Sequence, residues 1–230
     1  MKKEKIRALA IDGPAGAGKS TIARAVSREL GWIYVDTGAM FRAVALFFLR
    51  EGIRPDDADG IRDRISEVLV TLGYENGEQQ VYLNGENVSG MIRTEEVGNM
   101  ASACSVYPEV RQKLLELQRA LAVRQPVVMD GRDIGTVVLP DAETKVYLTA
   151  SVEVRARRRY RELQEKGAAC DIAEIEKDIR ERDWRDMHRE TAPLRQAEDA
   201  VLVDTSELSI EEVVRKVTGL IRPKMQEEGR

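Results

Sequence analysis

The sequence predicts an α/β protein whose core is a sheet of about five parallel strands covered by helices. Three observations lead to this fold class. Short apolar runs rich in β-branched residues recur along the 230-residue chain, as expected of strands buried on both faces. The segments between these runs are long enough for crossover helices. A glycine-rich turn follows the first run and opens a helix.

The expected elements alternate along most of the chain. Strands are expected at residues 6–11, 32–35, 127–129, 145–149 and 201–203, with the first helices at residues 20–30 and 39–51. One block interrupts this alternation, because Asn76-Gly77 and Asn84-Gly85 are typical of tight hairpin turns. We therefore expect an antiparallel meander of about three strands at about residues 68–90, followed by helices from about residue 94 to 123.

This block and a second, arginine-rich segment divide the chain into parts. We expect residues 39–124 to form a lobe inserted into the core and residues 151–192 to form a helical lid. The core then comprises residues 1–38, 125–150 and 193–222, and residues 223–230 are expected to form a frayed tail.

The strongest motif is a phosphate-binding loop between the first strand and its helix. It matches the pattern G-x-x-x-x-G-K-[ST] at every fixed position. Glycines let successive backbone N–H groups point at phosphate oxygens, and the helix N-terminus adds a positive dipole. We expect Lys19 to reach the β- and γ-phosphates of a nucleotide and the Ser20 hydroxyl to bind Mg²⁺. The expected ATP contacts in this loop are Gly13, Pro14, Ala15, Gly16, Ala17, Gly18, Lys19, Ser20 and Thr21.

Charged residues follow two further strands, at the edge where such sheets bind ligands. Asp36 and Asp130 each stand at a strand end, and we expect both to hold Mg²⁺ through water. Thr37 can cap the next helix. Arg132 is expected to face a phosphate, and Asp133 a hydrogen-bond donor. Residues 36–42 could instead be an ordinary strand–turn–helix junction. Residues 130–133 could instead be a self-paired surface turn.

Arginines are concentrated in the predicted lid. Arg182, Asp186 and Arg189 are spaced by four and three residues, which places them on one face of a helix. Upstream lies a run of guanidinium groups suited to closing over a polyphosphate. That run includes Arg155, Arg158 and Arg159. The alternative is a solvated, salt-bridged helix, since acidic residues nearly balance the basic ones in this segment.

On these motifs the chain resembles the bacterial cytidylate kinases, a family of P-loop nucleoside monophosphate kinases. The similarity extends from Ile6 to about Ile221. Its most specific segments are residues 13–20, 36–42, 92–97 (Ile-Arg-Thr-Glu-Glu-Val), 130–136 (Asp-Gly-Arg-Asp-Ile-Gly-Thr) and 181–186. The resemblance implies that the inserted lobe binds the monophosphate and that the arginine-rich segment is a lid.

The resemblance also implies a role for each matching residue. Lys19, Arg132 and Arg189 take catalytic roles. The implied CMP contacts are Thr37, Arg42, Ser102, Arg111, Arg132, Asp133, Arg182, Asp186 and Arg189, and many relatives have Ser in place of Thr37. Among these, Ser102, Arg111 and Asp133 contact cytosine, and Asp186 contacts a ribose hydroxyl. Arg155, Arg158 and Arg159 are the candidate lid contacts to ATP.

A carboxylate at position 133 suits cytosine chemically. Cytosine offers an exocyclic amine as a donor, whereas uracil has a carbonyl there, which would face Asp133 as a second acceptor. A buried unmatched polar pair costs ~1–3 kcal/mol, so we expect a preference for cytosine of about tenfold to a hundredfold.

The implied reaction is ATP-dependent phosphorylation of CMP and dCMP to CDP and dCDP by in-line phosphoryl transfer, in pyrimidine nucleotide metabolism. Mg²⁺ is the implied cofactor and ATP the co-substrate. The single histidine, His188, speaks against mechanisms that need a histidine pair or triad. The nucleophile here is a phosphate oxygen, which is already ionised at neutral pH and needs no general base.

Composition limits the partners and the compartment. The formal net charge of −4 speaks against a nucleic-acid partner, and no apolar run approaches the ~18 residues of a membrane span. The two cysteines form neither a disulfide framework nor a zinc site, so we expect a cytoplasmic protein. A monomer is expected by default.

Two other classes fit parts of the sequence. One is another P-loop small-molecule kinase that acts on UMP, AMP or a sugar-like acid. The other is a nucleotide-dependent regulatory or nucleic-acid-binding module that uses the arginine-rich segment as its contact surface.

Overall fold

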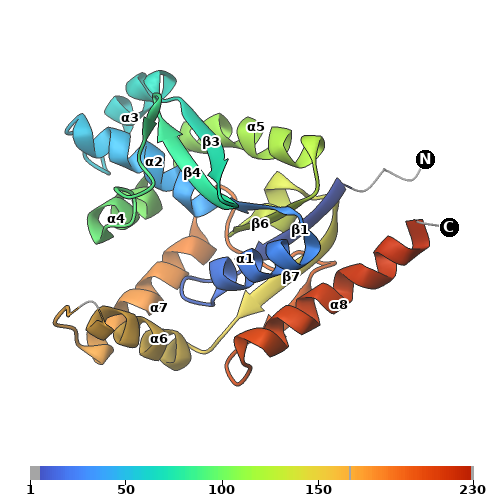
Figure 1. Cartoon of the computed structure of the whole chain (residues 1–230). Coiled ribbons are helices and arrows are strands. Elements are labelled where there is room, and N and C mark those ends of the chain that lie inside the picture. The colour runs from blue at the N-terminus through green and yellow to red at the C-terminus, as the bar shows by residue number, and fades with distance from the viewer. Residues whose placement is uncertain (1–5, 166, 229–230) are drawn as a thin grey trace. The chain divides into compact units, whose positions relative to one another are not determined.

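The computed structural model describes residues 6–165 and 167–228, and the chain divides into two compact units (Figure 1). The core unit comprises Met1–Ile33 and Gln125–Arg230, and the inserted unit comprises Tyr34–Arg124. The inserted unit therefore begins within the second strand, a few residues before the expected start of the lobe. The arginine-rich segment does not separate as a third unit but belongs to the core unit.

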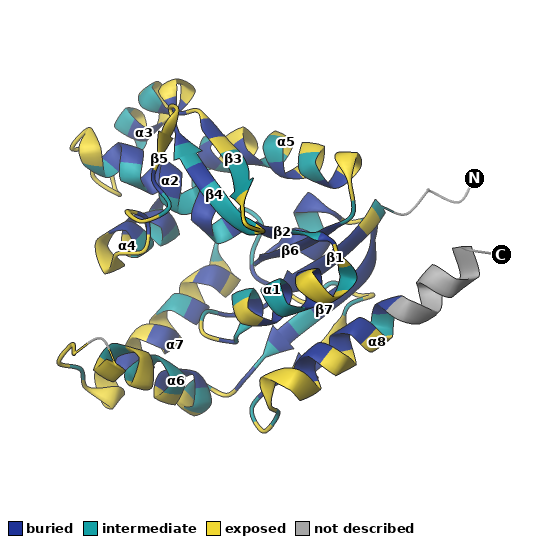
Figure 2. Cartoon of the chain, in the orientation of Figure 1, coloured by how far each residue is buried: buried dark blue, intermediate teal, exposed yellow. Residues whose placement is uncertain are grey.

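The core sheet has five strands in the order β2-β6-β1-β7-β8. β1 pairs in parallel with β6 and with β7, and β7 pairs in parallel with β8. The strands are β1 (Ile6–Asp12), β2 (Ile33–Asp36), β6 (Val127–Gly131), β7 (Ala142–Thr149) and β8 (Val201–Asp204). Figure 2 shows β1 and β6 largely in the colour of buried residues. The prediction of a five-stranded parallel sheet is confirmed, and the carboxyl ends of β1, β6, β7 and β8 lie at one edge.

The core unit also contains helices, two of which contact the strands of this sheet while two pack mainly on one another. They are α1 (Lys19–Leu30), α6 (Val152–Glu165), α7 (Ile172–His188) and α8 (Ile210–Glu228), with a short helical turn, η2 (Ile134–Val138). α1 buries Ile22, Ala23 and Val26 on one face and packs beside α8, whereas α6 packs beside α7 (Figure 1). α1 ends at Gly31, whose φ of 66° is the left-handed conformation that glycine adopts most easily.

The C-terminal helix is longer than the sequence predicts. α8 buries Val213, Val217 and Ile221, and it continues past Pro223 to Glu228, where we expected a frayed tail. A proline removes one helix hydrogen bond without ending every helix, and here the preceding turns are anchored in the core. Residues 229–230 of the predicted tail lie outside the described residues.

The inserted unit combines helices with a small sheet. Its elements are α2 (Thr37–Arg50), α3 (Ala58–Arg64), η1 (Ile65–Glu67), β3 (Val70–Glu75), β4 (Glu78–Leu83), β5 (Glu86–Asn87), α4 (Glu95–Cys104) and α5 (Pro108–Arg124). The three strands form an antiparallel sheet in the order β3-β4-β5. The expected meander is therefore confirmed, whereas α3 is an additional helix that the sequence analysis missed.

The two predicted Asn-Gly turns form both hairpins of this sheet. Asn76 and Gly77 have φ angles of 52° and 78°, and Asn84 and Gly85 have φ angles of 49° and 87°. Two successive positive φ angles match the right-handed twist of the flanking strands. These turns set the register that places Tyr74 opposite Gln79.

Asp36, rather than Thr37, caps α2. The Asp36 carboxylate accepts a hydrogen bond from the Ala39 amide at 2.9 Å, and Thr37 is the first residue of the helix. The expected cap at Thr37 is thus wrong by one position, because the carboxylate one residue earlier already satisfies a free amide of the first turn.

Among the described residues, no helix is long and apolar enough to cross a membrane.

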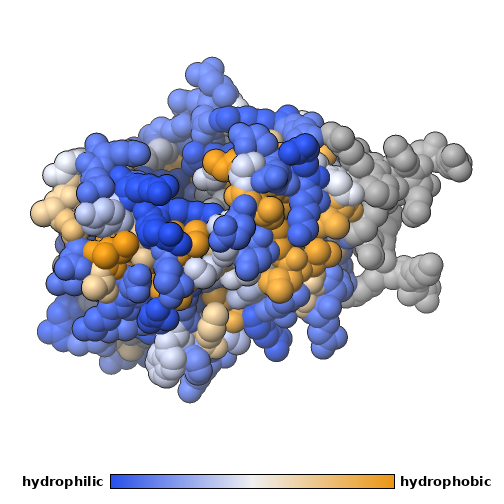
Figure 3. Space-filling model, turned by 90° about the horizontal axis from the view of Figure 1, so that it is seen from below, coloured by the Kyte–Doolittle hydropathy of each residue, from blue (hydrophilic) through white to orange (hydrophobic). Residues whose placement is uncertain are grey.

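Figure 3 shows a face of the molecule on which hydrophilic side chains predominate and hydrophobic ones gather in separate groups. Exposed hydrophobic residues of the core unit include Leu202 and Ile210.

Candidate functional site

The phosphate-binding loop lies between β1 and α1, at the carboxyl edge of the core sheet. Gly13 directly follows β1, and a Cβ atom at this position would overlap the carbonyl oxygen of Leu148. Gly18 precedes α1 with a φ of 88°, which favours glycine. The loop needs glycine at these two positions, one for space and the other for its backbone angle. This is the strand–loop–helix context that the motif predicts.

Lys19 is buried, with 6% of its surface exposed. Its Nζ atom donates a hydrogen bond to the carbonyl oxygen of Pro14 at 2.8 Å, which holds the side chain across the loop. Burial, helped by the nearby Arg132 guanidinium, lowers the pKa of Lys19 to about 7. The ammonium therefore lacks an anionic partner strong enough to offset desolvation, and an arriving phosphate would supply one.

Ser20 and Asp130 lie together beneath the loop. The Ser20 Oγ atom donates to Oδ2 of Asp130 at 3.0 Å, which joins α1 to the end of β6. A hydroxyl and a carboxylate are hard oxygen ligands of the kind that Mg²⁺ prefers, so the pair fits the expected metal. No group of three or more His, Cys, Asp or Glu residues suited to a metal occurs in the described chain. Such an ion would therefore need water or phosphate oxygens to complete its coordination.

Asp12, at the end of β1, is a site residue that the sequence analysis missed. Both of its carboxylate oxygens accept backbone hydrogen bonds at 2.7 Å, one from Ile134 and one from Gly135. Burial raises the pKa of Asp12 to about 7, although these two amides oppose the shift. Asp12 fixes the turn that follows Arg132 and Asp133. The position of Asp12 directly before Gly13, the first glycine of the loop, was the sequence signal that could have identified it as a site residue.

Arg132, Asp133, Asp186 and Arg189 form one charged cluster in the core unit. Nε of Arg132 lies 2.8 Å from Oδ2 of Asp186, and Nη2 of Arg189 lies 3.8 Å from Oδ1 of Asp133. Burial would raise the pKa of Asp186, but Arg132 and the other arginines nearby outweigh it and lower the pKa. Arg182 lies on α7, the helix that carries Asp186, and is half-buried. The structure therefore brings together the residues that the sequence predicted for this edge and for α7.

The short segment after α7 holds Arg189 in place. The Nε and Nη2 atoms of Arg189 donate to the carbonyl oxygen of Ala192 at 2.8 and 2.6 Å. Ala192 has a φ of 49°, which is uncommon for a residue with a side chain. The Leu194 amide also donates to the Asp186 carbonyl oxygen at 2.8 Å. These contacts fix the end of α7 and with it the Arg189 guanidinium.

The three candidate lid arginines have different surroundings. Arg155 is buried and donates to the carboxylate of Asp183 and to backbone carbonyls. Arg158 donates to the side chain and the carbonyl of Thr205, at 3.2 and 2.7 Å, and burial lowers the pKa of Arg158. Arg159 forms an exposed ion pair with Glu162 at 3.1 Å. The three are therefore not equivalent as contacts for a nucleotide.

Asp36 is the centre of a charged cluster in the inserted unit. Its Oδ2 atom accepts a hydrogen bond from Nη2 of Arg93 at 2.9 Å and lies 3.7 Å from Nη2 of Arg42. Burial would raise the pKa of Asp36, but the two guanidinium groups and the Ala39 amide outweigh it and lower the pKa. Because Asp36 already faces two cations and an amide, it is better placed to orient arginines than to hold a metal. Arg93 lies in residues 92–97, one of the segments that carry the family resemblance, which assigned it no role.

Gln79 of β4 holds the end of β2 by two hydrogen bonds. The Asp36 amide donates to Oε1 of Gln79 at 2.9 Å, and Nε2 of Gln79 donates to the Asp36 carbonyl oxygen at 3.3 Å. The Tyr74 hydroxyl donates to the carbonyl oxygen of Tyr34 at 3.0 Å. The small sheet thereby positions Asp36 and the buried Thr37 beside it.

The predicted cytosine contacts of the inserted unit lie in and around α4 and α5. Nη1 of Arg111 donates to the carbonyl oxygen of Ser105 at 3.1 Å, and the guanidinium lies 5.4 Å from the centre of the Phe41 ring. Ser102 is half-buried, and its carbonyl accepts from the Ser105 hydroxyl at 2.8 Å. Ser105 therefore links the two predicted contacts, because it accepts from Arg111 and donates to Ser102.

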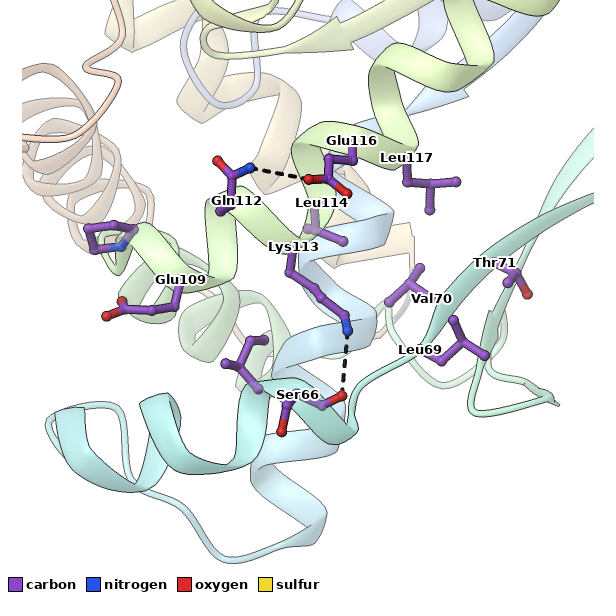
Figure 4. Close-up of a pocket in the computed structure, with 12 residues that line it drawn as sticks. Ser66, Leu69, Val70, Thr71, Glu109, Gln112, Lys113, Leu114, Glu116 and Leu117 are labelled. Atoms are coloured by element: carbon purple, nitrogen blue, oxygen red, sulfur yellow. Dashed lines mark hydrogen bonds between the residues drawn. The ribbon is translucent and has the colours of Figure 1, made fainter.

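A separate open groove of about 900 Å³ lies between α5, η1 and β3 of the inserted unit (Figure 4). Leu69, Val70 and Leu117 supply apolar surface, and Nζ of Lys113 donates to the carbonyl oxygen of Ser66 at 3.5 Å. The described residues that line this groove include none of the predicted substrate contacts.

The parallel sheet, the phosphate-binding loop and the buried lysine define an α/β protein of the P-loop class. Two solved structures share this fold at low sequence identity. A gluconokinase from Sinorhizobium meliloti aligns with a TM-score of 0.51 and 16% identity over 99% of this chain and 100% of that one. An uncharacterized protein from Eubacterium ventriosum aligns with a TM-score of 0.53 and 10% identity over 95% of this chain and 99% of that one.

Sequence comparison specifies the family within this class. The family model described as cytidylate kinase matches residues 9–223. A cytidylate kinase from Lactobacillus johnsonii is 48% identical over 229 residues, which cover 98% of this chain and 100% of that protein. A cytidylate kinase from Caldicellulosiruptor bescii is 49% identical over 212 residues, which cover 92% of this chain and 94% of that protein. The chain belongs to the cytidylate kinase family.

Proposed function

We propose that this protein transfers the γ-phosphoryl group of ATP to CMP and dCMP, forming CDP and dCDP. The observation that carries the proposal is the phosphate-binding loop with its buried Lys19, in a chain that matches the cytidylate kinase family over residues 9–223. The implied cellular role is pyrimidine nucleotide metabolism.

The core unit supplies the binding groups for ATP. Loop amides and the N-terminus of α1 suit the phosphate oxygens, and the Lys19 ammonium regains a counter-charge when the nucleotide binds. Ser20 and Asp130 would hold Mg²⁺, Ser20 directly and Asp130 through water. A bound Mg²⁺ supplies charge neutralisation at the β- and γ-phosphates.

Arginines in each unit offer contacts for the acceptor monophosphate. Arg132 and Arg189 are held by carboxylates and by the Ala192 carbonyl, so their guanidinium groups are preorganised. In the inserted unit, Arg42 and Arg93 converge on Asp36. Guanidinium groups bind phosphate oxygens in two-point geometry, and their charge stabilises the transferring phosphoryl group. Catalysis then consists of positioning and charge neutralisation, without a general base.

Asp133 is the proposed reader of the cytosine amine. It is 5% exposed, so a mismatched base would leave its carboxylate desolvated opposite an acceptor. Ser102 and Arg111 are the further proposed contacts to the base, and Asp186 and Arg182 contacts to the ribose and phosphate. The buried position of Asp133 supports its role, because polar discrimination is strongest where water is excluded.

The remaining parts of the proposal concern partners and compartment. We propose that the protein acts on small nucleotides as a cytoplasmic monomer and binds no nucleic acid. The net charge of −4 supports the last point, since nonspecific nucleic-acid binding depends on excess positive charge.

The test is ADP formation from ATP and Mg²⁺ with CMP, dCMP, UMP and AMP as separate acceptors, with Lys19→Met as the inactive control. We expect CMP and dCMP to be phosphorylated most efficiently and Lys19→Met to lose activity by at least about a hundredfold. A preference for UMP or AMP would assign the site to another acceptor. Turnover with none of the four by folded protein would overturn the proposal.

A further inference from the structure

The outer side of the phosphate-binding loop is held by side chains that lie far from it in the sequence. The carbonyl oxygen of Ala15 accepts a hydrogen bond from Nη1 of Arg155 at 3.0 Å. The Thr205 hydroxyl lies 3.4 Å from the carbonyl oxygen of Ala17, but its single proton is closer to the carbonyl oxygen of Thr149, at 3.1 Å. In a trans peptide the carbonyl and the following amide point in opposite directions. Fixing the Ala15 carbonyl therefore fixes where the amide of Gly16 points.

Arg155 is occupied almost completely by the protein itself. Its Nε donates to the carbonyl oxygen of Ala150 at 3.0 Å, and Nη1 and Nη2 donate to the two oxygens of Asp183 at 3.1 and 2.6 Å. With the bond to Ala15, four of its five N–H groups have partners. Arg155 is 4% exposed. A direct bond to ATP would require this arrangement to open, so the geometry favours a different role from the expected one.

Asp183 connects this arrangement to α7. It is itself buried, and it is the acid that balances the Arg155 charge. The same helix carries Arg182 and Asp186, and Arg189 directly follows its last residue; all three are proposed acceptor contacts. α6 also abuts the loop directly, because a Cβ atom at Gly16 would lie 3.3 Å from Cβ of Arg155. One ion pair therefore links the loop, α6 and α7.

We propose that Arg155 and Asp183 are positioning residues that set the Ala15–Gly16 peptide for phosphate binding. The inference deepens the proposed function and rests on it only in taking the loop ligand to be a nucleoside triphosphate. Arg155 holds the Ala15 carbonyl outward so that the Gly16 amide faces the phosphates. Asp183 keeps the guanidinium in register, since a bidentate carboxylate fixes its plane. A shift of α7 is thereby transmitted to the loop.

The test is a double-mutant cycle with Arg155→Lys, Asp183→Asn and the double variant. Arg155→Lys keeps the charge but cannot bind Ala15 and both Asp183 oxygens in the same geometry. Asp183→Asn keeps the shape but removes the charge. The readout is the Kd of ATP and of inorganic tripolyphosphate, measured by calorimetry without any acceptor. Failure of the proposed acceptor therefore leaves this readout unaffected. Arg157→Lys on α6 and Asp178→Asn on α7, both exposed, are the matched controls.

We expect each single variant to raise the Kd of ATP and of tripolyphosphate by about tenfold or more. The double variant should bind no more weakly than the weaker-binding single variant. The controls should stay within about twofold of wild type. The KM for the acceptor should change less than the Kd of ATP. A purely structural role predicts a lower melting temperature with unchanged Kd values in the folded variants, and that result would overturn the proposal.

A direct contact between Arg155 and ATP predicts a different pattern. Releasing the guanidinium by Asp183→Asn would then leave ATP binding unchanged or tighter, while Arg155→Lys alone weakened it. That outcome also contradicts the proposal. If Asp183→Asn does not fold, Asp183→Glu takes its place in the cycle. It keeps the charge but moves the carboxylate, so we expect the same direction of change.

Discussion

The Ser20 hydroxyl oxygen lies 3.0 Å from Oδ2 of Asp130, although the two residues are 110 positions apart in the sequence. Ser20 lies in the first turn of α1, after the phosphate-binding loop, and Asp130 is the second-last residue of the neighbouring strand β6. The contact joins the two residues that we propose to hold Mg²⁺. It is a direct consequence of the parallel pairing of β1 with β6, which brings both strand ends to the same edge.

Ser20→Ala and Asp130→Asn should therefore raise the Mg²⁺ concentration needed for half-maximal activity. We expect an increase of about tenfold for either variant, because each removes a group from a shared ligand set. The measurement is a magnesium titration of the initial rate at saturating ATP and CMP. Ser27→Ala is the matched control, because the Ser27 hydroxyl donates to the backbone of its own helix, at Arg24. Equal magnesium requirements in all three variants would contradict the assignment.

Lys19 makes ATP binding depend on pH. Its pKa of about 7 in the free protein means that the ammonium loses its proton as the pH rises through 7. A bound polyphosphate favours the charged form, so binding above pH 7 takes up a proton, and the Kd should increase by up to about tenfold per pH unit. Calorimetry between about pH 7.5 and pH 9, in buffers of different ionisation enthalpy, measures both the Kd of ATP and the proton uptake on binding. Lys19→Met should bind more weakly and without this dependence. A flat Kd in the wild-type protein would refute the prediction.

Arg93 should affect the acceptor and not the donor. Its guanidinium meets Asp36 at 2.9 Å beside Arg42, and we expect Arg93→Ala to raise the KM for CMP by about tenfold to a hundredfold. Steady-state kinetics with both substrates varied measures the effect, and the Kd of ATP should stay within about twofold. Arg50→Ala is the matched control, because Arg50 forms an exposed pair with Glu86 in the same unit. If both variants behave alike, Arg93 has no specific role.

Two glycine substitutions in the inserted unit should change stability in opposite directions. Gly77 has a φ of 78° in a hairpin turn, so Gly77→Ala should reduce the free energy of unfolding by ~1 kcal/mol. Gly98 lies within α4, where an added Cβ meets nothing within 4 Å, so Gly98→Ala should increase it by ~0.5–1 kcal/mol. Denaturant titration measures both. A stabilising Gly77→Ala would contradict the turn assignment.

Local signals were sufficient for most of the fold. The five apolar runs predicted the strands of the parallel sheet, and the two Asn-Gly pairs predicted the hairpins, because each depends on the backbone of a few adjacent residues. Boundaries were less certain where side chains of similar chemistry compete. At the start of α2, for example, Asp36 and Thr37 are both good caps, and only the geometry shows that Asp36 accepts the Ala39 hydrogen bond.

The site could be predicted where a motif fixes spacing and not where it depends on distant contacts. The loop follows from sequence spacing, and so does the proximity of Asp186 and Arg189, although α7 ends at His188 and Arg189 lies just beyond the expected helix face. The position of Asp12 before the loop could have marked it as a site residue, but its bonds to Ile134 and Gly135 join residues more than a hundred positions apart and cannot be predicted from a local pattern. Arg155 illustrates the same limit, since an arginine that faces a ligand and one that faces a buried carboxylate read alike in a sequence.

The role of Asp133 in reading the base is tested most directly by an internal competition between CMP and UMP in one reaction with ATP and Mg²⁺, using wild-type protein, Asp133→Ala and Asp133→Asn. The ratio of CDP to UDP gives the ratio of kcat/KM values without separate rate measurements. We predict that CDP exceeds UDP by about tenfold to a hundredfold in the wild-type protein, and that Asp133→Ala removes most of this excess. Asp133→Asn should move the ratio toward UDP, since an amide can donate to the uracil carbonyl. An unchanged ratio in both variants would show that Asp133 does not read the base.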